Sequence, residues 1–194
     1  MATISDGART ELITLSDLKW QLAMQRNAQI NPPSSEDLNR ALQLLINQRL
    51  FALEAERLPR EAPQKAEINA KINELVSYFP TPVEFERRLN QVGFKSVADP
   101  NFERLIAQRI AIDKYLDFRF RSFIVITADD EAQYYRNVYV PEFRRRNPGV
   151  IVPSLDSKRA EIVGALTEER VAQQIETFLE EAKRRAEIVI LNPV

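Results

Sequence analysis

Residues 34–53 read SSEDLNRALQLLINQRLFAL and carry a helical pattern. Apolar side chains recur three and four residues apart, which places them on one face of a helix. Ser34 or Ser35 supplies the hydroxyl that caps a helix start, and Leu58-Pro59 marks the expected end. The members of the apolar stripe are Leu38, Ala41, Leu42, Leu45, Ile46, Leu50 and Leu53. This stretch predicts an amphipathic helix packed against a core.

Further helices are predicted on both sides of this segment. Thr81-Pro82-Val83-Glu84 combines a capping hydroxyl, a proline in the first turn and a glutamate three residues after the cap, and Gly93 ends that helix. The helix that begins at Asp99-Pro100 has the stripe Phe102, Leu105, Ile106, Arg109, Ile112, Tyr115 and Leu116 and runs to about Phe120. Other predicted helices run from Thr14 or Ser16 to about Asn27, from Pro63, from Thr127, and from about Leu155 to Arg185.

Three short segments have a strand pattern, at residues 11–15, 122–127 and 186–191. Three strands are too few for an independent sheet domain, so they must pair with one another beside the helices. We therefore expect one mainly α domain over residues 1–194, with a small β-sheet formed by N-terminal, central and C-terminal strands. The segment 141–153 contains Asn147-Pro148-Gly149 and is expected to be a loop.

The composition excludes several classes of function. The 194 residues include neither cysteine nor histidine, so a thiolate nucleophile, a Ser-His-Asp triad and a Cys/His zinc site cannot be built. The formal net charge of −1 removes the basic field that attracts nucleic acid. No apolar run approaches the roughly 20 residues that span a bilayer. We expect a binding protein, not an enzyme, with no cofactor, metal, nucleic-acid partner or integral membrane segment.

The densest acidic cluster, Asp129-Asp130-Glu131, has two interpretations. Acidic residues in the first turn of a helix stabilise the positive end of the helix dipole, so helix capping is the favoured one. A carboxylate enzyme built on the same residues is the alternative. Neither a calcium-loop spacing nor a glycine-rich phosphate loop accompanies the cluster.

The first predicted helix is apolar on two faces. Leu15, Leu18 and Leu22 share one face, and Trp20 and Met24 lie roughly opposite. Such a helix is either sandwiched in the core, which is the favoured interpretation, or has one face that waits for a partner. Trp and Met are side chains that suit adaptable binding surfaces.

Several motifs follow one another in a fixed order along most of the chain. They are Leu12-Ile13-Thr14-Leu15-Ser16-Asp17-Leu18, then Leu45-Ile46 with Glu54-Ala55, Phe85 to Leu89 with Gly93-Phe94, Arg119-Phe120-Arg121 with Val125-Ile126-Thr127, Glu131 to Tyr135, and finally Leu166, Glu169-Arg170, Phe178-Leu179, Arg185 and Ile188-Val189-Ile190. In this order the chain resembles the core domain of SurA-type periplasmic chaperones, the non-catalytic part of the SurA/PpiC-like parvulin family. No single motif is specific, and the order carries the resemblance.

The resemblance implies how the domain is divided. Residues 11–135 correspond to the N-terminal helical part, and the helix and strand at 155–191 pack back onto it. Residues 136–154 form a short connection where isomerase members of the family carry a whole parvulin domain. Parvulin sites typically use histidine, which this chain lacks, so no prolyl isomerase activity is expected. Gly7-Ala8-Arg9-Thr10 matches the family's first turn poorly, which leaves exchange of this edge between chains open.

The function implied by the resemblance is that of a chaperone. It would hold extended or unfolded segments of envelope and outer-membrane proteins in a groove between helices, with Trp20, Met24 and Tyr134 as candidate peptide-binding residues. The implied location is the periplasm, with the targeting leader already absent from the sequence. The alternative is a structural or interaction module for one dedicated partner. One form of this alternative is a homodimer whose chains exchange a segment.

Overall fold

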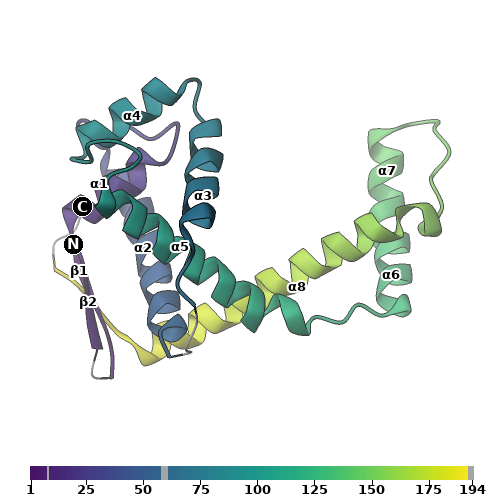
Figure 1. Ribbon diagram of the computed structural model, residues 1–194. Coiled ribbons are helices and arrows are strands. Elements are labelled where there is room, and N and C mark those ends of the chain that lie inside the picture. The colour runs from purple at the N-terminus through teal and green to yellow at the C-terminus, as the bar shows by residue number, and fades with distance from the viewer. Residues whose placement is uncertain (8, 58–60, 192–194) are drawn as a thin grey trace. The chain divides into compact units, whose positions relative to one another are not determined.

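The computed structural model describes residues 1–7, 9–57 and 61–191 and confirms the mainly helical class (Figure 1). The chain forms two compact units. Unit 1 comprises Met1–Tyr115 with Leu179–Val194, and unit 2 comprises Leu116–Phe178. Their boundaries fall inside two helices, α5 (Pro100–Arg119) and α8 (Leu155–Arg185), and not at the ends of segment 136–154.

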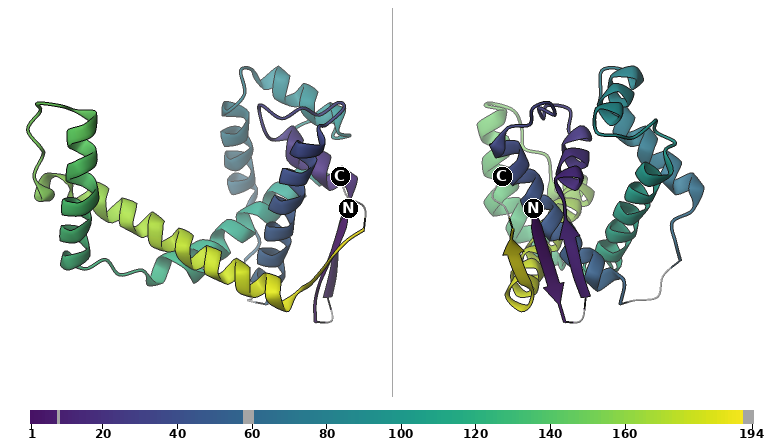
Figure 2. Two further views of the ribbon diagram at one scale, coloured as in Figure 1. Left: turned by 180° about the vertical axis from the view of Figure 1, so that it is seen from behind. Right: turned by 90° about the vertical axis from the view of Figure 1, so that its left-hand side faces the viewer.

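Unit 1 contains a three-stranded antiparallel sheet. Its strands are β1 (Ala2–Asp6), β2 (Arg9–Ile13) and β3 (Glu187–Ile190), in the order β2-β1-β3 (Figure 2, right). Ile4 stands opposite Glu11 on one side and Ile188 on the other. Ala2 and Ile4 are fully buried, because alternate side chains of a strand face the same side. The N-terminal and C-terminal strands of the predicted sheet are therefore confirmed.

The central strand predicted at 122–127 is wrong. Arg121–Phe123 form a short 3-10 helix, η1, and no regular element follows before the cap at Thr127. Phe123 and Val125 are 69% and 73% exposed. Side chains of this type favour a strand only where they pack against a neighbouring strand. In the described part of the chain, the sheet β2-β1-β3 does not include this segment. The third strand of the sheet is β1, which was not predicted.

Side-chain caps start the helices of unit 1. Thr14 caps α1 (Leu15–Ala23) in a reciprocal capping box, Ser34 caps α2 (Ser35–Ala55), and Thr81 caps α4 (Pro82–Gln91). These three starts confirm the predictions. The helix α3 (Lys65–Ser77) begins after the predicted Pro63, and α1 ends before the predicted Asn27. The predicted end of α2 at Leu58-Pro59 lies outside the described residues.

Unit 2 is built from α6 (Ala128–Tyr134), a π-helical turn η2 (Tyr135–Tyr139), α7 (Val140–Arg146) and most of α8. The loop predicted at 141–153 is therefore wrong up to Arg146 and confirmed after it. Pro141 lies in the first turn of α7, which continues η2 without a break, so this proline stands inside a helical run and removes a backbone donor there. The wider π-helical turn before it accommodates the ring, which is why this proline does not end the helix.

The core of unit 1 is an aromatic cluster. Phe79 lies 4.8 Å from Phe85, Phe85 6.0 Å from Phe102, and Phe94 5.3 Å from Phe102, measured between ring centroids. Phe85 and Phe102 are fully buried, and each such side chain contributes about 1.5–3 kcal/mol through burial alone. Met24 belongs to the same cluster. The cluster therefore fixes the end of α1 against α3, α4 and α5.

Arg88 holds the end of α1 to α4. Its Nε donates to the Ala23 carbonyl over 3.1 Å, and its Nη2 is within 2.7–3.1 Å of the carbonyls of Leu22, Gln25 and Ala28. A helix leaves its last carbonyls without partners, and a cation there also matches the helix dipole. Burial lowers the pKa of Arg88, which remains charged at neutral pH.

Candidate functional site

A groove of about 810 Å³ opens on unit 1. We call it the α1–α5 groove. Its walls come from α1, from α2 and the residue after it, from the segment before α3, and from α5. The lining residues are Asp17, Trp20, Arg49, Ala55, Glu56, Glu61, Ala62, Pro63, Asn101, Arg104, Leu105, Ala107, Gln108 and Ala111. Half of these residues are apolar, and the others are polar or charged. The groove therefore combines a hydrophobic wall with polar ends, as ligand sites commonly do.

Trp20 is held in the wall of this groove by its ring. The indole Nε1–H donates to the Val92 carbonyl over 3.0 Å, and the ring centroid lies 5.0 Å from that of Phe94. The side chain is half-buried, so one part of the ring packs on the core and another lines the groove. The face of α1 that carries Trp20 therefore contacts both the core and this groove, while Leu18 and Leu22 are buried on the other face.

The inner end of the groove is polar. Arg49 Nη1 lies 3.4 Å from Gln108 Oε1, and its nearest carboxylate oxygens belong to Glu11 at 3.7 Å and Asp17 at 3.9 Å. The Nε–H of Arg49 is buried and has no hydrogen-bond partner. A buried N–H without an acceptor costs about 1–3 kcal/mol, so this guanidinium is under-satisfied in the structure.

A small cavity of about 30 Å³ adjoins the groove. We call it the inner cavity, and it shares Asp17, Arg49, Leu105 and Gln108 with the groove lining. Gln21, Leu45, Gln48, Arg109 and Ile112 complete its walls. Arg109 Nη2 donates to Oε1 of the buried Gln21. Burial lowers the pKa of Arg109 to about 10, against the opposing effect of the Asp113 charge, so the Arg109 guanidinium is cationic at neutral pH.

Met24 does not line the groove. Its side chain is 7% exposed and lies in the aromatic core cluster of unit 1. The core interpretation of the first helix is therefore confirmed for Met24, while Trp20 contacts both the core and the groove.

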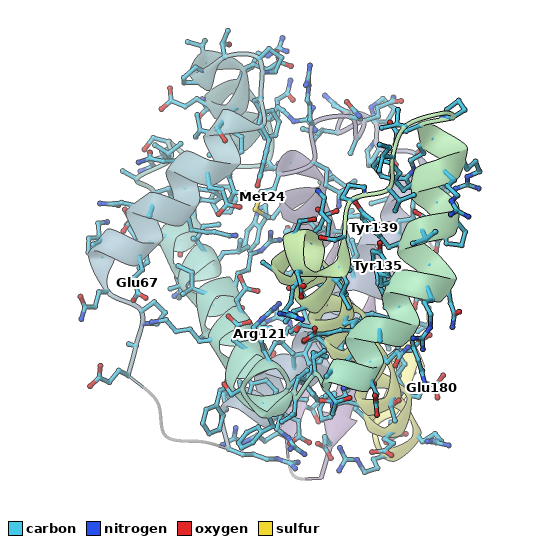
Figure 3. The ribbon with its side chains drawn as sticks, turned by 90° about the vertical axis from the view of Figure 1, so that its right-hand side faces the viewer. Met24, Glu67, Arg121, Tyr135, Tyr139 and Glu180 are labelled. Carbon is cyan, nitrogen blue, oxygen red and sulfur yellow. The ribbon has the colours of Figure 1, made fainter. Side chains whose placement is uncertain are left out.

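Tyr134 lies in unit 2, beside a separate cavity of about 310 Å³. The neighbouring Tyr135 stacks on Tyr139 with ring centroids 5.6 Å apart, and both residues are labelled in Figure 3. Tyr139 in turn stacks on Phe143 at 5.9 Å. The Tyr135 hydroxyl donates to the Pro153 carbonyl over 2.7 Å. Both Tyr134 and Tyr135 are half-buried. The candidates Trp20 and Tyr134 belong to different units.

The acidic cluster at the start of α6 is a helix cap. Asp130 accepts hydrogen bonds from the Thr127 N–H at 2.9 Å and from the Thr127 hydroxyl at 2.7 Å. Asp130 also pairs with Arg170 at 2.6 Å, and Glu131 with Arg159 at 2.9 Å. The hydrogen bonds from Thr127 lower the pKa of Asp130, which keeps it ionised. The capping interpretation is confirmed for Asp130.

Sequence reasoning missed two arginines, Arg49 of the groove and Arg109 of the inner cavity. Arg109 occupies a position in the apolar stripe of α5, and a charged residue at such a position is the signal that could have found it. Arg49 lies between Gln48 and Leu50 without any local motif. Among residues 1–7, 9–57 and 61–191, no group of three or more acidic side chains is placed to hold a metal ion.

Comparison with known proteins adds no relative. No family model matches the chain, and neither a curated protein nor a solved structure matches it. Within the described part of the chain, the helices lack the combined length and apolarity that a membrane crossing needs.

Proposed function

We propose that this protein is a periplasmic chaperone of the SurA core type, which binds extended or unfolded segments of outer-membrane proteins. The observation that supports the proposal is the α1–α5 groove, with Trp20 in an apolar wall and polar groups at its end. Its volume of about 810 Å³ lies in the range of about 300–1,000 Å³ typical of sites that enclose a ligand. The proposed activity is holding clients, with no prolyl isomerase step and no cofactor.

The groove suits a short stretch of extended polypeptide. Trp20, Leu105 and Ala111 offer apolar contacts without a deep shape that would select one side chain. Binding of this kind loses part of its free energy to ordering the client chain, so affinity is expected to be modest. Weak, reversible binding is what a holding chaperone needs, because the client must later be released.

The proposal is tested by light scattering of a urea-diluted outer-membrane barrel protein, with and without this protein. We expect dose-dependent suppression of aggregation and no acceleration of prolyl isomerisation in a parallel peptide assay. Ala111→Arg places a long side chain in the groove and should weaken the suppression severalfold. Ala70→Arg, an exposed position on α3 outside the groove lining, is the matched control and should leave it unchanged. Unchanged aggregation at excess protein would contradict the proposal.

The alternative function is an interaction module that exchanges a segment between two copies. The observation that favours it is that β1 pairs with β3, and the Leu191 N–H donates to the Met1 carbonyl over 2.9 Å. The same pairs would form if β3 came from a second chain. Val189, Ile190 and Leu191 are 42–49% exposed at this end of the sheet. A solution mass that stays at the monomer value across concentrations would exclude the exchanged dimer.

A further inference from the structure

The inner end of the α1–α5 groove contains an arginine, Arg49, whose acceptors all lie at long distances. Arg49 and Arg109 come from different helices, α2 and α5, and both line the inner cavity. Arg49 has its closest acceptor, the Gln108 amide oxygen, at 3.4 Å and its closest carboxylate at 3.7 Å. Both distances are long for charge-assisted hydrogen bonds, which lie near 2.7–2.9 Å. Arg49 thus has donors in place without well-placed acceptors, whereas Arg109 donates to Gln21 Oε1 and also interacts with the charge of Asp113.

Asp17 does not close this gap. Its Oδ2 accepts from the Thr14 N–H at 2.8 Å and from the Thr14 hydroxyl at 2.7 Å, which fixes the carboxylate as the cap of α1. Only Oδ1 faces Arg49, at 3.9 Å. Turning Asp17 toward Arg49 would break the cap, which costs about 1 kcal/mol. The Nε–H of Arg49 therefore stays unpaired among the residues of the site.

The inner cavity has the size of a small anionic group. A cavity needs roughly 10–15 Å³ to hold one water, and this one measures about 30 Å³. It therefore has room for about two oxygen atoms. A carboxylate has two oxygens and a phosphate four, so the cavity favours the carboxylate. A carboxylate also matches the planar fork of a guanidinium.

We propose that the inner cavity binds a carboxylate of the polypeptide that occupies the α1–α5 groove, between the guanidinium groups of Arg49 and Arg109. The inference rests on the proposed function, because the groove must first hold an extended chain. The carboxylate comes from the C-terminus of the client or from an aspartate or glutamate side chain. The groove then binds client segments by apolar contact at Trp20 and orients them by charge at its inner end.

The experiment uses the chain's only tryptophan, Trp20, as its reporter. The probes are acetylated, tryptophan-free heptapeptides of alternating valine and threonine. One has a free C-terminus, one a C-terminal amide, and two are amidated with either glutamate or glutamine at the central position. Titration of the full-length protein, followed by Trp20 fluorescence, gives a Kd for each. We expect the free acid to bind about tenfold more tightly than the amide, or glutamate about tenfold more tightly than glutamine.

The two comparisons distinguish the two sources of the carboxylate, and a gain in either supports the inference. Arg49→Gln and Arg109→Gln should each reduce that gain to near one. Arg40→Gln is the matched control and should keep the gain, since Arg40 lies on α2 like Arg49 but is exposed and lines neither the groove nor the inner cavity. Because the peptide comparison uses unmodified protein, a variant that fails to fold does not affect the conclusion.

Two negative results have different meanings. Equal affinity for the acid and amide peptides, and for the glutamate and glutamine peptides, would overturn the carboxylate site and leave groove binding intact. Absence of any fluorescence change with all four peptides would overturn peptide binding in this groove, and the carboxylate site with it.

Discussion

Phe85 in unit 1 and Phe143 in unit 2 are the same side chain in different surroundings. Phe85 is fully buried between Phe79 and Phe102, whereas Phe143 is half-buried and stacks on Tyr139 at 5.9 Å. Among the described residues, the largest fully buried side chains belong to unit 1, with the exception of Ile162. Unit 1 is therefore held mainly by burial of apolar surface, the dominant favourable term in folding.

Unit 2 relies more on exposed ion pairs. Arg121 pairs with Asp117 at 3.0 Å and bidentately with Glu168, one of those contacts being 2.9 Å. Exposed pairs of this kind contribute little, because solvent and salt screen them. Segments with few buried apolar contacts open first in native proteins. We therefore expect unit 1, which contains the groove, to be the more stable unit, and unit 2 to open more easily.

Replacing the two phenylalanines gives the largest expected contrast. Phe85→Ala should lower the free energy of unfolding of unit 1 by about 3–5 kcal/mol, because it leaves a cavity in the aromatic cluster. Phe143→Ala should cost about 1–2 kcal/mol, since a half-buried stacked ring loses less. Urea unfolding combined with hydrogen exchange resolved by segment measures both. Equal losses at the two sites would contradict the difference between the units.

Two arginines sharpen the comparison. Arg88→Ala should lower the free energy of unfolding by about 2–3 kcal/mol, because it leaves buried carbonyls at the end of α1 without their donor. Arg121→Ala removes an equally extensive set of contacts, but the Arg121 side chain is 41% exposed. We therefore expect no change in the free energy of unfolding that urea titration resolves. A loss at Arg121 as large as that at Arg88 would show that ion pairs support unit 2 as strongly as burial supports unit 1.

The smallest expected effect is a pH dependence of α6. Hydrogen bonds from Thr127 lower the pKa of Asp130 in the folded state. The stabilisation is therefore present above the ordinary aspartate pKa of about 3.9 and is lost as the pH falls through the lowered folded value. Hydrogen-exchange protection of α6 should decline in that acid range. Asp130→Asn should remove the decline, and Asp129→Asn, its neighbour, should keep it.

Glu168 titrates in the same acid range, because its contact with Arg121 also lowers its pKa. Because Glu168 belongs to α8, hydrogen exchange should be measured at the amides of α6 to report on Asp130. A decline that persists in Asp130→Asn would assign the pH dependence to another carboxylate.

Local signals made the helices predictable. Thr14, Ser34, Thr81 and Thr127 cap the helices that their sequences indicated, because a cap needs only residues three positions apart. The strand at 122–127 failed because strand formation depends on a partner elsewhere in the chain. The same reason explains why β1 was missed, since its composition is unremarkable without its two neighbours.

The groove was predictable in part. Trp20 was found because an apolar residue opposite the main stripe of a helix is visible in sequence. Its opposite-face neighbour Met24 turned out to be core, because periodicity does not tell a covered face from an open one. Arg49 and Arg109 line the same cavity from α2 and α5, and no sequence spacing reveals that they do.

The order of the strands in the sheet has a consequence for biosynthesis. β1 is the middle strand, and one of its edges is covered by β3, which begins at Glu187. On the ribosome, β1 emerges long before β3 has been translated. Until then, the edge of β1 that pairs with β3 has no partner strand. An open strand edge is a template for pairing with other chains. The nascent chain is thus exposed to mispairing while residues 14–186 are translated, and unit 1 completes its sheet only once β3 has been made.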